Sequence, residues 1–130
     1  MFEKILFPTD FSAYAKKTLD CIAGFPGARE VILFHVIEEA KSPWGGGEIG
    51  DVLFRTGEGN LLKEEKRHLE NLSQNLRVTT AVKISSDIAG AIIETAEEKS
   101  VSLIVVGARG NNYIEGILLG SVSIAVLRRS

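Results

Sequence analysis

The segment at residues 30–37 (EVILFHVI) constrains the fold of this chain more than any other feature. It is almost uniformly apolar, whereas a strand with one exposed face alternates apolar and polar residues. Strands with such continuous apolar runs are typical of parallel sheets that helices cover on both faces. The sequence therefore predicts a buried parallel sheet between two layers of helices.

Strand and helix patterns alternate along the rest of the chain. Further strands are predicted at residues 4–7, 77–84 and 102–106. Helices are predicted after Pro8-Thr9-Asp10, over 61–76, after Ser86-Asp87, and over a short segment from Ser121 to about Leu127. Residues 41–60 carry Pro43 and six glycines, which predicts one long loop. This order indicates an α/β fold, a doubly wound parallel sheet of the Rossmann-like sandwich type, with right-handed crossovers.

The size and charge of the chain limit its domain count and its partners. With 130 residues and 45% hydrophobic side chains, one domain over 1–130 is expected. Fifteen Lys and Arg nearly balance 17 Asp and Glu, so no basic field favours unspecific binding to nucleic acid or a membrane. No apolar run approaches the ~18 residues of a membrane span. No signal peptide is visible and the single cysteine excludes an internal disulfide, which together favour a cytoplasmic protein.

A spaced-glycine motif follows the predicted strand 102–106. It reads Gly-Ala-Arg-Gly at 107–110, with Gly120-Ser121 ten residues further on. Glycines let the backbone turn sharply and approach a ligand closely, and the amides of Ser121 and Val122 at a helix start suit a phosphate. The Ser121 hydroxyl can also donate to a phosphate oxygen. The alternative is that these glycines only close a strand-to-helix loop, and the motif alone does not decide between the two.

The loop Pro8-Thr9-Asp10 ends the first predicted strand and favours the phosphate interpretation. In the commonest small doubly wound topology the first and fourth strands are neighbours, and ligands bind beyond their carboxyl ends. Both loops would then face one crevice. The Asp10 carboxylate can accept hydrogen bonds from a ribose hydroxyl or an adenine amino group. Asp10 is also a candidate N-cap of the first helix, together with Thr9 and Ser12, and the two roles are compatible.

Four motifs, in this order, resemble the universal stress protein family. They are FPTDFS at 7–12, LFHV at 33–36, LIVVG at 103–107 and LLGSV at 118–122. The resemblance implies a five-strand sheet in the order 3-2-1-4-5, a homodimer, and membership of the branch that binds ATP. It implies that Asp10 and the backbone of Val36 lie near adenine and ribose, with Pro8 and Thr9 shaping that pocket. The phosphates would be bound by Gly107, Gly110, Gly120, Ser121 and Val122. Arg109 is equally well explained as a phosphate contact or as a solvated loop residue.

The chain departs from the family pattern at two places. Ala108 stands where many relatives have Ser, which removes one hydroxyl donor. The chain also stops at residues 128–130, where relatives continue into a fifth strand. We therefore expect the fifth strand to be absent and strand 102–106 to be an exposed edge. Such an edge favours association, so we expect another chain, the glycine-rich loop or a nonstandard dimer to cover it, and a homodimer is favoured.

These features favour a cytoplasmic stress-response protein that binds ATP or ADP as a regulatory ligand. An unknown protein partner would recognise the change that the bound nucleotide causes. Mg²⁺ or Mn²⁺ would be carried by the nucleotide, since no cluster has the spacing of a dedicated metal site. No catalytic residue is predicted, and His35 is read as a packed strand histidine. The alternatives are a slow ATP hydrolase, and an interaction module of the same fold that binds no nucleotide.

Overall fold

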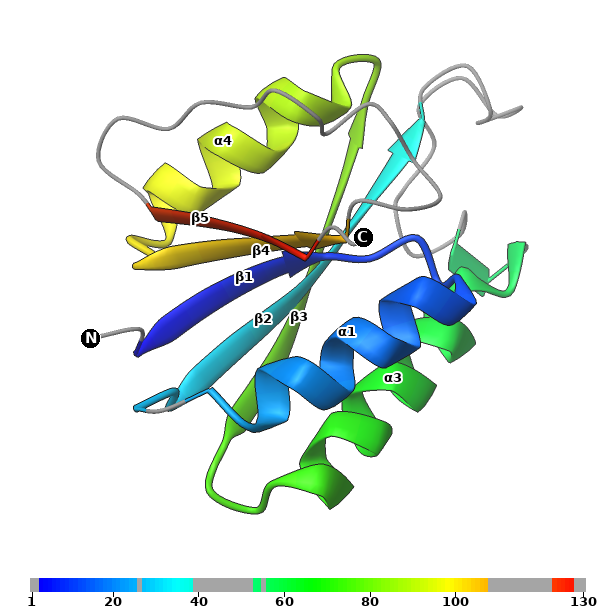
Figure 1. The fold of residues 1–130 in the computed structure, drawn as a ribbon. Helices are drawn as coiled ribbons and strands as arrows, with labels where there is room; N and C mark the ends of the chain where they lie inside the picture. Colours follow the sequence, from blue (N-terminus) through cyan, green and yellow to red (C-terminus); the bar gives the residue numbers. More distant parts are fainter. Residues whose placement is uncertain (1–2, 26, 39–52, 55, 108–122, 128–130) are drawn as a thin grey trace.

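The structure, a computed structural model, describes residues 3–25, 27–38, 53–54, 56–107 and 123–127. These residues form a five-stranded parallel sheet in the order β3-β2-β1-β4-β5. Its strands are β1 (Lys4–Pro8), β2 (Glu30–Glu38), β3 (Arg77–Ser85), β4 (Leu103–Gly107) and β5 (Ser123–Leu127). The helices are α1 (Ala13–Ala23), α3 (Glu58–Leu72) and α4 (Ile88–Glu98). Because α1 and α3 lie on one face of the sheet and α4 on the other, the predicted α/β doubly wound sheet is confirmed (Figure 1).

The expectation that the fifth strand is absent is wrong. Ser123–Leu127 forms β5 and pairs in parallel with the whole of β4, so β4 is not an exposed edge. The short helix expected from Ser121 to about Leu127 is wrong for the same residues. A five-residue apolar segment is compatible with either structure, and the otherwise unpaired backbone groups of β4 favour the strand.

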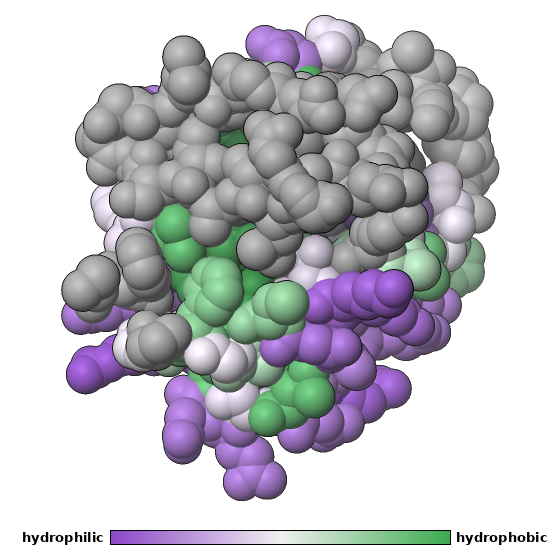
Figure 2. Space-filling view, viewed as in Figure 1, coloured by the Kyte–Doolittle hydropathy of each residue, from purple (hydrophilic) through white to green (hydrophobic). Residues whose placement is uncertain are grey.

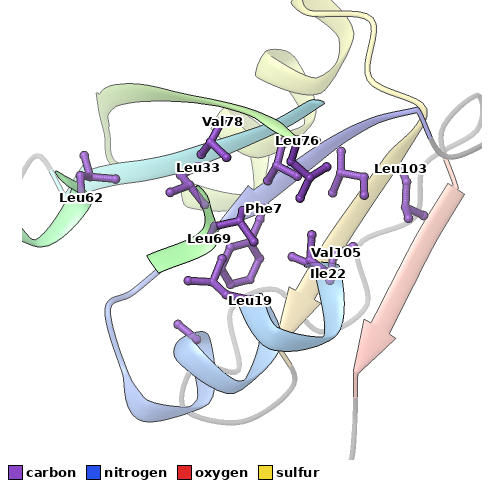
Figure 3. Close-up of a cluster of buried hydrophobic side chains, with 13 residues drawn as sticks. Phe7, Leu19, Ile22, Leu33, Leu62, Leu69, Leu76, Val78, Leu103 and Val105 are labelled. Atoms are coloured by element: carbon purple, nitrogen blue, oxygen red, sulfur yellow. The ribbon is translucent and has the colours of Figure 1, made fainter. Parts of the chain in front are cut away.

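Alternation along the central strands divides the core into two clusters, one on each face of the sheet. Successive side chains of a strand point to opposite faces. Val31 and Leu33 of β2 therefore join the cluster beneath α1 and α3, whereas Ile32 and Phe34 join the cluster beneath α4. Phe7 lies in the first cluster near Leu19 (Figure 3). The prediction that the strand 30–37 is buried on both faces is confirmed.

The helices begin where the sequence provides capping groups. Ser12 caps α1 by accepting a hydrogen bond from the amide of Ala15, and Asp87 caps α4 by accepting one from Gly90. Helix α3, predicted over 61–76, begins earlier than expected, at Glu58, within the segment predicted to be a loop. Gly57 precedes it with a φ of 79°, a left-handed conformation that glycine adopts without strain.

The described surface near α1 and α3 is largely hydrophilic. Figure 2 shows hydrophilic side chains in the lower part of the view, with a hydrophobic area at its centre. No helix within the described ranges is both long and apolar enough to span a bilayer.

Candidate functional site at the carboxyl edge of the sheet

The strand order creates a switch point between β1 and β4. The chain winds from β1 outward to β2 and β3, and on the other side from β4 to β5. The predicted neighbourhood of the first and fourth strands is confirmed, because Ile5 pairs with Leu103 and Leu6 with Ile104. In open α/β sheets the crevice for a ligand lies beyond the carboxyl ends of such a pair of strands.

The turn that leaves β1 is fixed by backbone and side-chain hydrogen bonds. The amide of Thr9 donates to the carbonyl oxygen of Phe34 at 2.8 Å, which ties the turn to β2. Oδ1 of Asp10 accepts from the amide of Ser12 at 2.9 Å. Phe11 has a φ of 64°, in the left-handed region that a bulky residue rarely adopts, so the surrounding contacts hold it there.

Among the three candidate caps, the structure selects Ser12. Its Oγ accepts from the amide of Ala15, three residues further along the chain, as an N-cap side chain does. Asp10 stands too early for that bond and instead closes a two-residue turn onto the Ser12 amide. The interpretation of Asp10 and Thr9 as N-caps is therefore wrong.

A buried hydrogen-bond network lies beneath this turn and centres on Thr9, which is 4% exposed. Its hydroxyl donates to Oε2 of Glu65 at 3.0 Å and accepts from the amide of Phe11 at 3.1 Å. Glu65 comes from α3 and is 3% exposed. One hydroxyl group thus joins the turn after β1 to α3, a helix distant in sequence.

The environment of Glu65 disfavours its charge. The pKa of Glu65 is raised from 4.5 to about 7, mainly by burial, and the negative charge of Asp10 contributes in the same direction. The hydrogen bond from Thr9 and the positive charges of Lys16 and His68 act in the opposite direction. The other carboxylate oxygen, Oε1, is buried and has no hydrogen-bond partner. This acid therefore changes charge near neutral pH.

His35 supports the same turn from β2. Its Nδ1 lies 3.2 Å from the carbonyl oxygen of Thr9, and its Nε2 lies 2.9 Å from Oε2 of Glu58. A carbonyl oxygen only accepts, so Nδ1 donates and Thr9 is held from a second side. The ring also packs against that of Phe11, with centroids 4.6 Å apart. The interpretation of His35 as a packed strand histidine agrees with its burial, but both ring nitrogens also have polar partners.

The structure brings several predicted site residues to this edge. Pro8 ends β1 and pairs with Phe34, and Thr9 and Asp10 follow directly. Val36 lies two residues beyond Phe34 on β2 and is partly buried. Gly107 ends β4. The remaining predicted residues lie outside the described residues: Arg109, Gly110, Gly120, Ser121 and Val122.

The pairing of β5 removes one argument for a phosphate site at Gly120-Ser121. Ser123 pairs with Leu103 at the amino end of β4, whereas Gly107 lies at its carboxyl end. These ends are about 13 Å apart, at about 3.3 Å per residue. Because residues 123–127 form a strand, the argument from the N-terminus of a helix that runs to Leu127 no longer holds. The argument from the glycine spacing is unaffected.

The sequence reasoning missed Glu65 and Glu58. A signal for Glu65 was present, because it is three residues after Leu62 and four before Leu69 and so interrupts the apolar stripe of its helix. No such signal marks Glu58, which lies in the segment read as loop. Across the described ranges, no group of three or more His, Cys, Asp or Glu residues could hold a metal ion.

Comparison with known proteins agrees with this architecture. A profile of the universal stress protein family matches residues 1–130. The chain belongs to the universal stress protein family. Universal stress protein MJ0577 of Methanocaldococcus jannaschii is 30% identical over 148 residues, which cover 100% of this chain and 91% of that protein.

Solved structures show the same fold. The structure of hypothetical protein MJ0577 matches this universal stress protein with a TM-score of 0.74 at 28% identity, covering 100% of this chain and 98% of that chain. A universal stress protein in complex with cAMP has a TM-score of 0.69 at 20% identity, covering 98% of each chain. The universal stress protein from Archaeoglobus fulgidus in complex with dAMP has a TM-score of 0.71 at 17% identity, covering 97% and 98%.

Proposed function

We propose that this universal stress protein binds ATP or ADP at the carboxyl edge between β1 and β4, and that the nucleotide is a regulatory ligand. The observation that carries the proposal is the adjacency of β1 and β4 at the switch point, with the Asp10 carboxylate directly beyond β1. Proteins of the same fold have been solved with cAMP and dAMP, which supports an adenine nucleotide as the ligand class.

The base and ribose are assigned to the turn after β1 and the end of β2. Asp10 accepts hydrogen bonds from a ribose hydroxyl or the adenine amino group. The backbone of Val36 contacts the base, and Pro8 and Thr9 shape the wall of the pocket. Two of these residues are held rigidly, since Pro8 is paired in the sheet and Thr9 is bonded to β2 and α3.

The phosphates are assigned to the glycine motif. Gly107 and Gly110 let the backbone approach the phosphates, with Arg109 as a cationic contact. The glycine spacing also assigns Gly120, Ser121 and Val122 to the phosphates, although the next residue, Ser123, pairs at the amino end of β4. Gly110→Val and Gly120→Val separate the two halves of this motif. Both variants should weaken binding. Since Ser123 pairs at the amino end of β4, we expect the larger loss for Gly110→Val. Equal affinity of both variants and the parent protein would contradict the phosphate assignment.

A divalent cation, Mg²⁺ or Mn²⁺, is expected to bind with the triphosphate and to neutralise charge that amides alone leave uncompensated. The phosphate oxygens of the nucleotide would be its ligands, with the Ser121 hydroxyl as the candidate group of this chain. Affinity for ATP should fall when the cation is chelated, and nucleotide-free protein should contain no stoichiometric metal.

The regulatory role is favoured over rapid hydrolysis. Hydrolysis needs a group that orients water and a cation that stabilises the transferred phosphoryl group, and Arg109 is the one cationic candidate in the motif. Turnover should stay below ~1 s⁻¹.

We place the protein in the cytoplasm as a stress-response protein whose partner distinguishes the nucleotide-bound form. We further propose a homodimer that uses the outer edge of β5, in place of the exposed β4 edge first expected; sedimentation at micromolar concentration tests it.

The test begins with acid extraction of the purified protein and chromatography of the released nucleotide. Calorimetry of ATP binding to Asp10→Asn then tests the site, because asparagine keeps the Oδ1 acceptor for the Ser12 amide and loses only the charge. Asp20→Asn is the matched control, since it removes the same charge from an exposed position on α1. The parent and the control should bind in the micromolar range, and Asp10→Asn at least tenfold more weakly. Equal affinities would contradict the assignment.

A further inference from the structure

Glu65 differs from the other carboxylates of the described chain in its burial. It is the only Asp or Glu among the described residues with a buried side chain. Its Oε2 accepts from the Thr9 hydroxyl, while its Oε1 is enclosed without a hydrogen-bond partner. An unpartnered carboxylate oxygen in the interior is costly, and protonation lowers that cost. The Thr9 hydroxyl is therefore bonded to an acid whose burial favours the protonated form.

The single hydrogen bond of Glu65 leads directly to the residues of the nucleotide pocket. Thr9 uses one hydroxyl group both to donate to Glu65 and to accept from the amide of Phe11. Asp10 lies between Thr9 and Phe11 in the chain. A change in the charge of Glu65 therefore alters the strength of the bond that fixes the turn on which Asp10 is carried.

Charged groups from three elements face this acid. Asp10 comes from the turn after β1, Lys16 from α1 and His68 from α3 itself. On the other side of Thr9, His35 of β2 contacts the Thr9 carbonyl oxygen and Glu58. The negative charge of Asp10 opposes ionisation of Glu65, and Lys16 and His68 favour it. A nucleotide would add further negative charge at the same edge of the sheet, through the phosphates assigned to the glycine motif.

We propose that Glu65 is a positioning residue that acts through Thr9 on Asp10, and that its protonation strengthens nucleotide binding at this edge. The second part rests on the proposed function. Because the bound nucleotide adds negative charge at the same edge of the sheet, it disfavours ionised Glu65, and the complex takes up a proton at this acid. Affinity therefore falls as the pH rises through the neutral range. A rise of one unit in the pKa of Glu65 on binding corresponds to a tenfold change in affinity.

The positioning role is tested on the nucleotide-free protein by NMR. The side-chain carboxyl carbon of Glu65 should titrate near pH 7, and the amides of Thr9, Asp10 and Phe11 should follow the same midpoint. In Glu65→Gln, an isosteric change that keeps an acceptor for Thr9, these amides should lose that transition. Glu64→Gln, an exposed neighbour on the same helix, should leave it in place. The rings of His35 and His68 are followed in the same spectra to separate their titrations.

The effect on binding is tested by calorimetry with ATP at pH 6 and pH 8. The nucleotide phosphate titrates in this range for every variant, so the decisive quantity is the difference between the parent and Glu65→Gln. The ratio of affinities between the two pH values should be several-fold larger for the parent and for Glu64→Gln than for Glu65→Gln. Proton uptake, measured in buffers of different ionisation enthalpy, should fall in Glu65→Gln.

The outcomes separate the two proposals. If Glu65 titrates below pH 5, or if the three amides do not follow it, the positioning role is wrong. If the ratio of affinities is the same for the parent and Glu65→Gln, the coupling to nucleotide is wrong. If no variant binds nucleotide at any pH, the proposed function and the coupling both fail, and the titration of the free protein still decides whether Glu65 positions the turn.

Discussion

Two turns at the carboxyl edge of the sheet each lead from a strand into a capped helix, but different hydrogen bonds hold them in place. The turn after β1 leads into α1 through the cap Ser12, and the turn after β3 leads into α4 through the cap Asp87. The capping bonds are nearly equal in length, at 3.1 Å to Ala15 and 3.0 Å to Gly90. Around the second turn, the hydrogen bonds of Ser85 and Asp87 are exposed and local.

The turn after β1 has contacts that capping does not require. Thr9 is buried and bonded to α3 and β2, and Phe11 is held in a left-handed conformation against His35. A strand-to-helix turn can be capped without any of these contacts, as the turn after β3 shows. The excess of buried polar contacts in the first turn is consistent with a turn that holds a ligand group, here Asp10, in a fixed place.

The largest effect that separates the two turns is expected for Thr9→Val. The change leaves the buried Oε2 of Glu65 without its donor and the Phe11 amide without its acceptor. The free energy of unfolding should fall by about 3 kcal/mol, as for buried polar groups that lose their partners. Ser85→Ala removes two exposed bonds of the other turn and should cost less than ~1 kcal/mol. Urea denaturation measures both, and similar losses would abolish the distinction between the turns.

The next effect is a dependence of stability on pH that belongs to Glu65. Its pKa is about 7 in the folded protein and 4.5 as an unperturbed group, so the folded state binds the proton more tightly. The stabilisation is fully present below the unfolded pKa and is lost as the pH rises towards and through 7. Relative to Glu65→Gln, the parent should lose roughly 2 kcal/mol of stability between pH 5 and pH 8. Parallel stability curves for the two proteins would contradict the buried acid.

The smallest difference is expected where the turns are alike. Ser12→Ala and Asp87→Ala each remove one capping bond and should each cost about 1 kcal/mol. Thermal melting of the two variants measures this. A much larger loss for Ser12→Ala would mean that its cap is coupled to the network around Thr9, because Asp10 accepts from the Ser12 amide.

The sequence predicted the central architecture because its signals are local. The apolar run at 30–37 indicates burial on both faces, and the alternation of strands and helices indicates the parallel sheet. The commonest small doubly wound topology then predicted that β1 and β4 lie side by side, as they do. The pattern at Ser123–Leu127 fits a helix or a strand, and only the vacant edge of β4 decides between them. The choice of cap among Thr9, Asp10 and Ser12 likewise depends on the path of the turn.

The buried network was beyond sequence reasoning because it joins residues far apart in the chain. Thr9 and Glu65 are 56 positions apart, and His35 and Glu58 are 23 apart. Each pair is formed because α3 packs on the sheet beside α1 and over β3. The interruption of an apolar stripe at Glu65 could have indicated a buried acid, but not its partner.

The most direct test of the central claim is an NMR titration of the isotopically labelled protein with ATP and Mg²⁺. The claim is that the turn after β1 holds a nucleotide and that the turn after β3 only caps a helix. We predict saturable shifts of the amides of Thr9, Asp10, Phe11, Val36 and Gly107, with those of Ser85, Ser86 and Asp87 unchanged. The absence of saturable shifts, or equal shifts in both turns, would contradict the account.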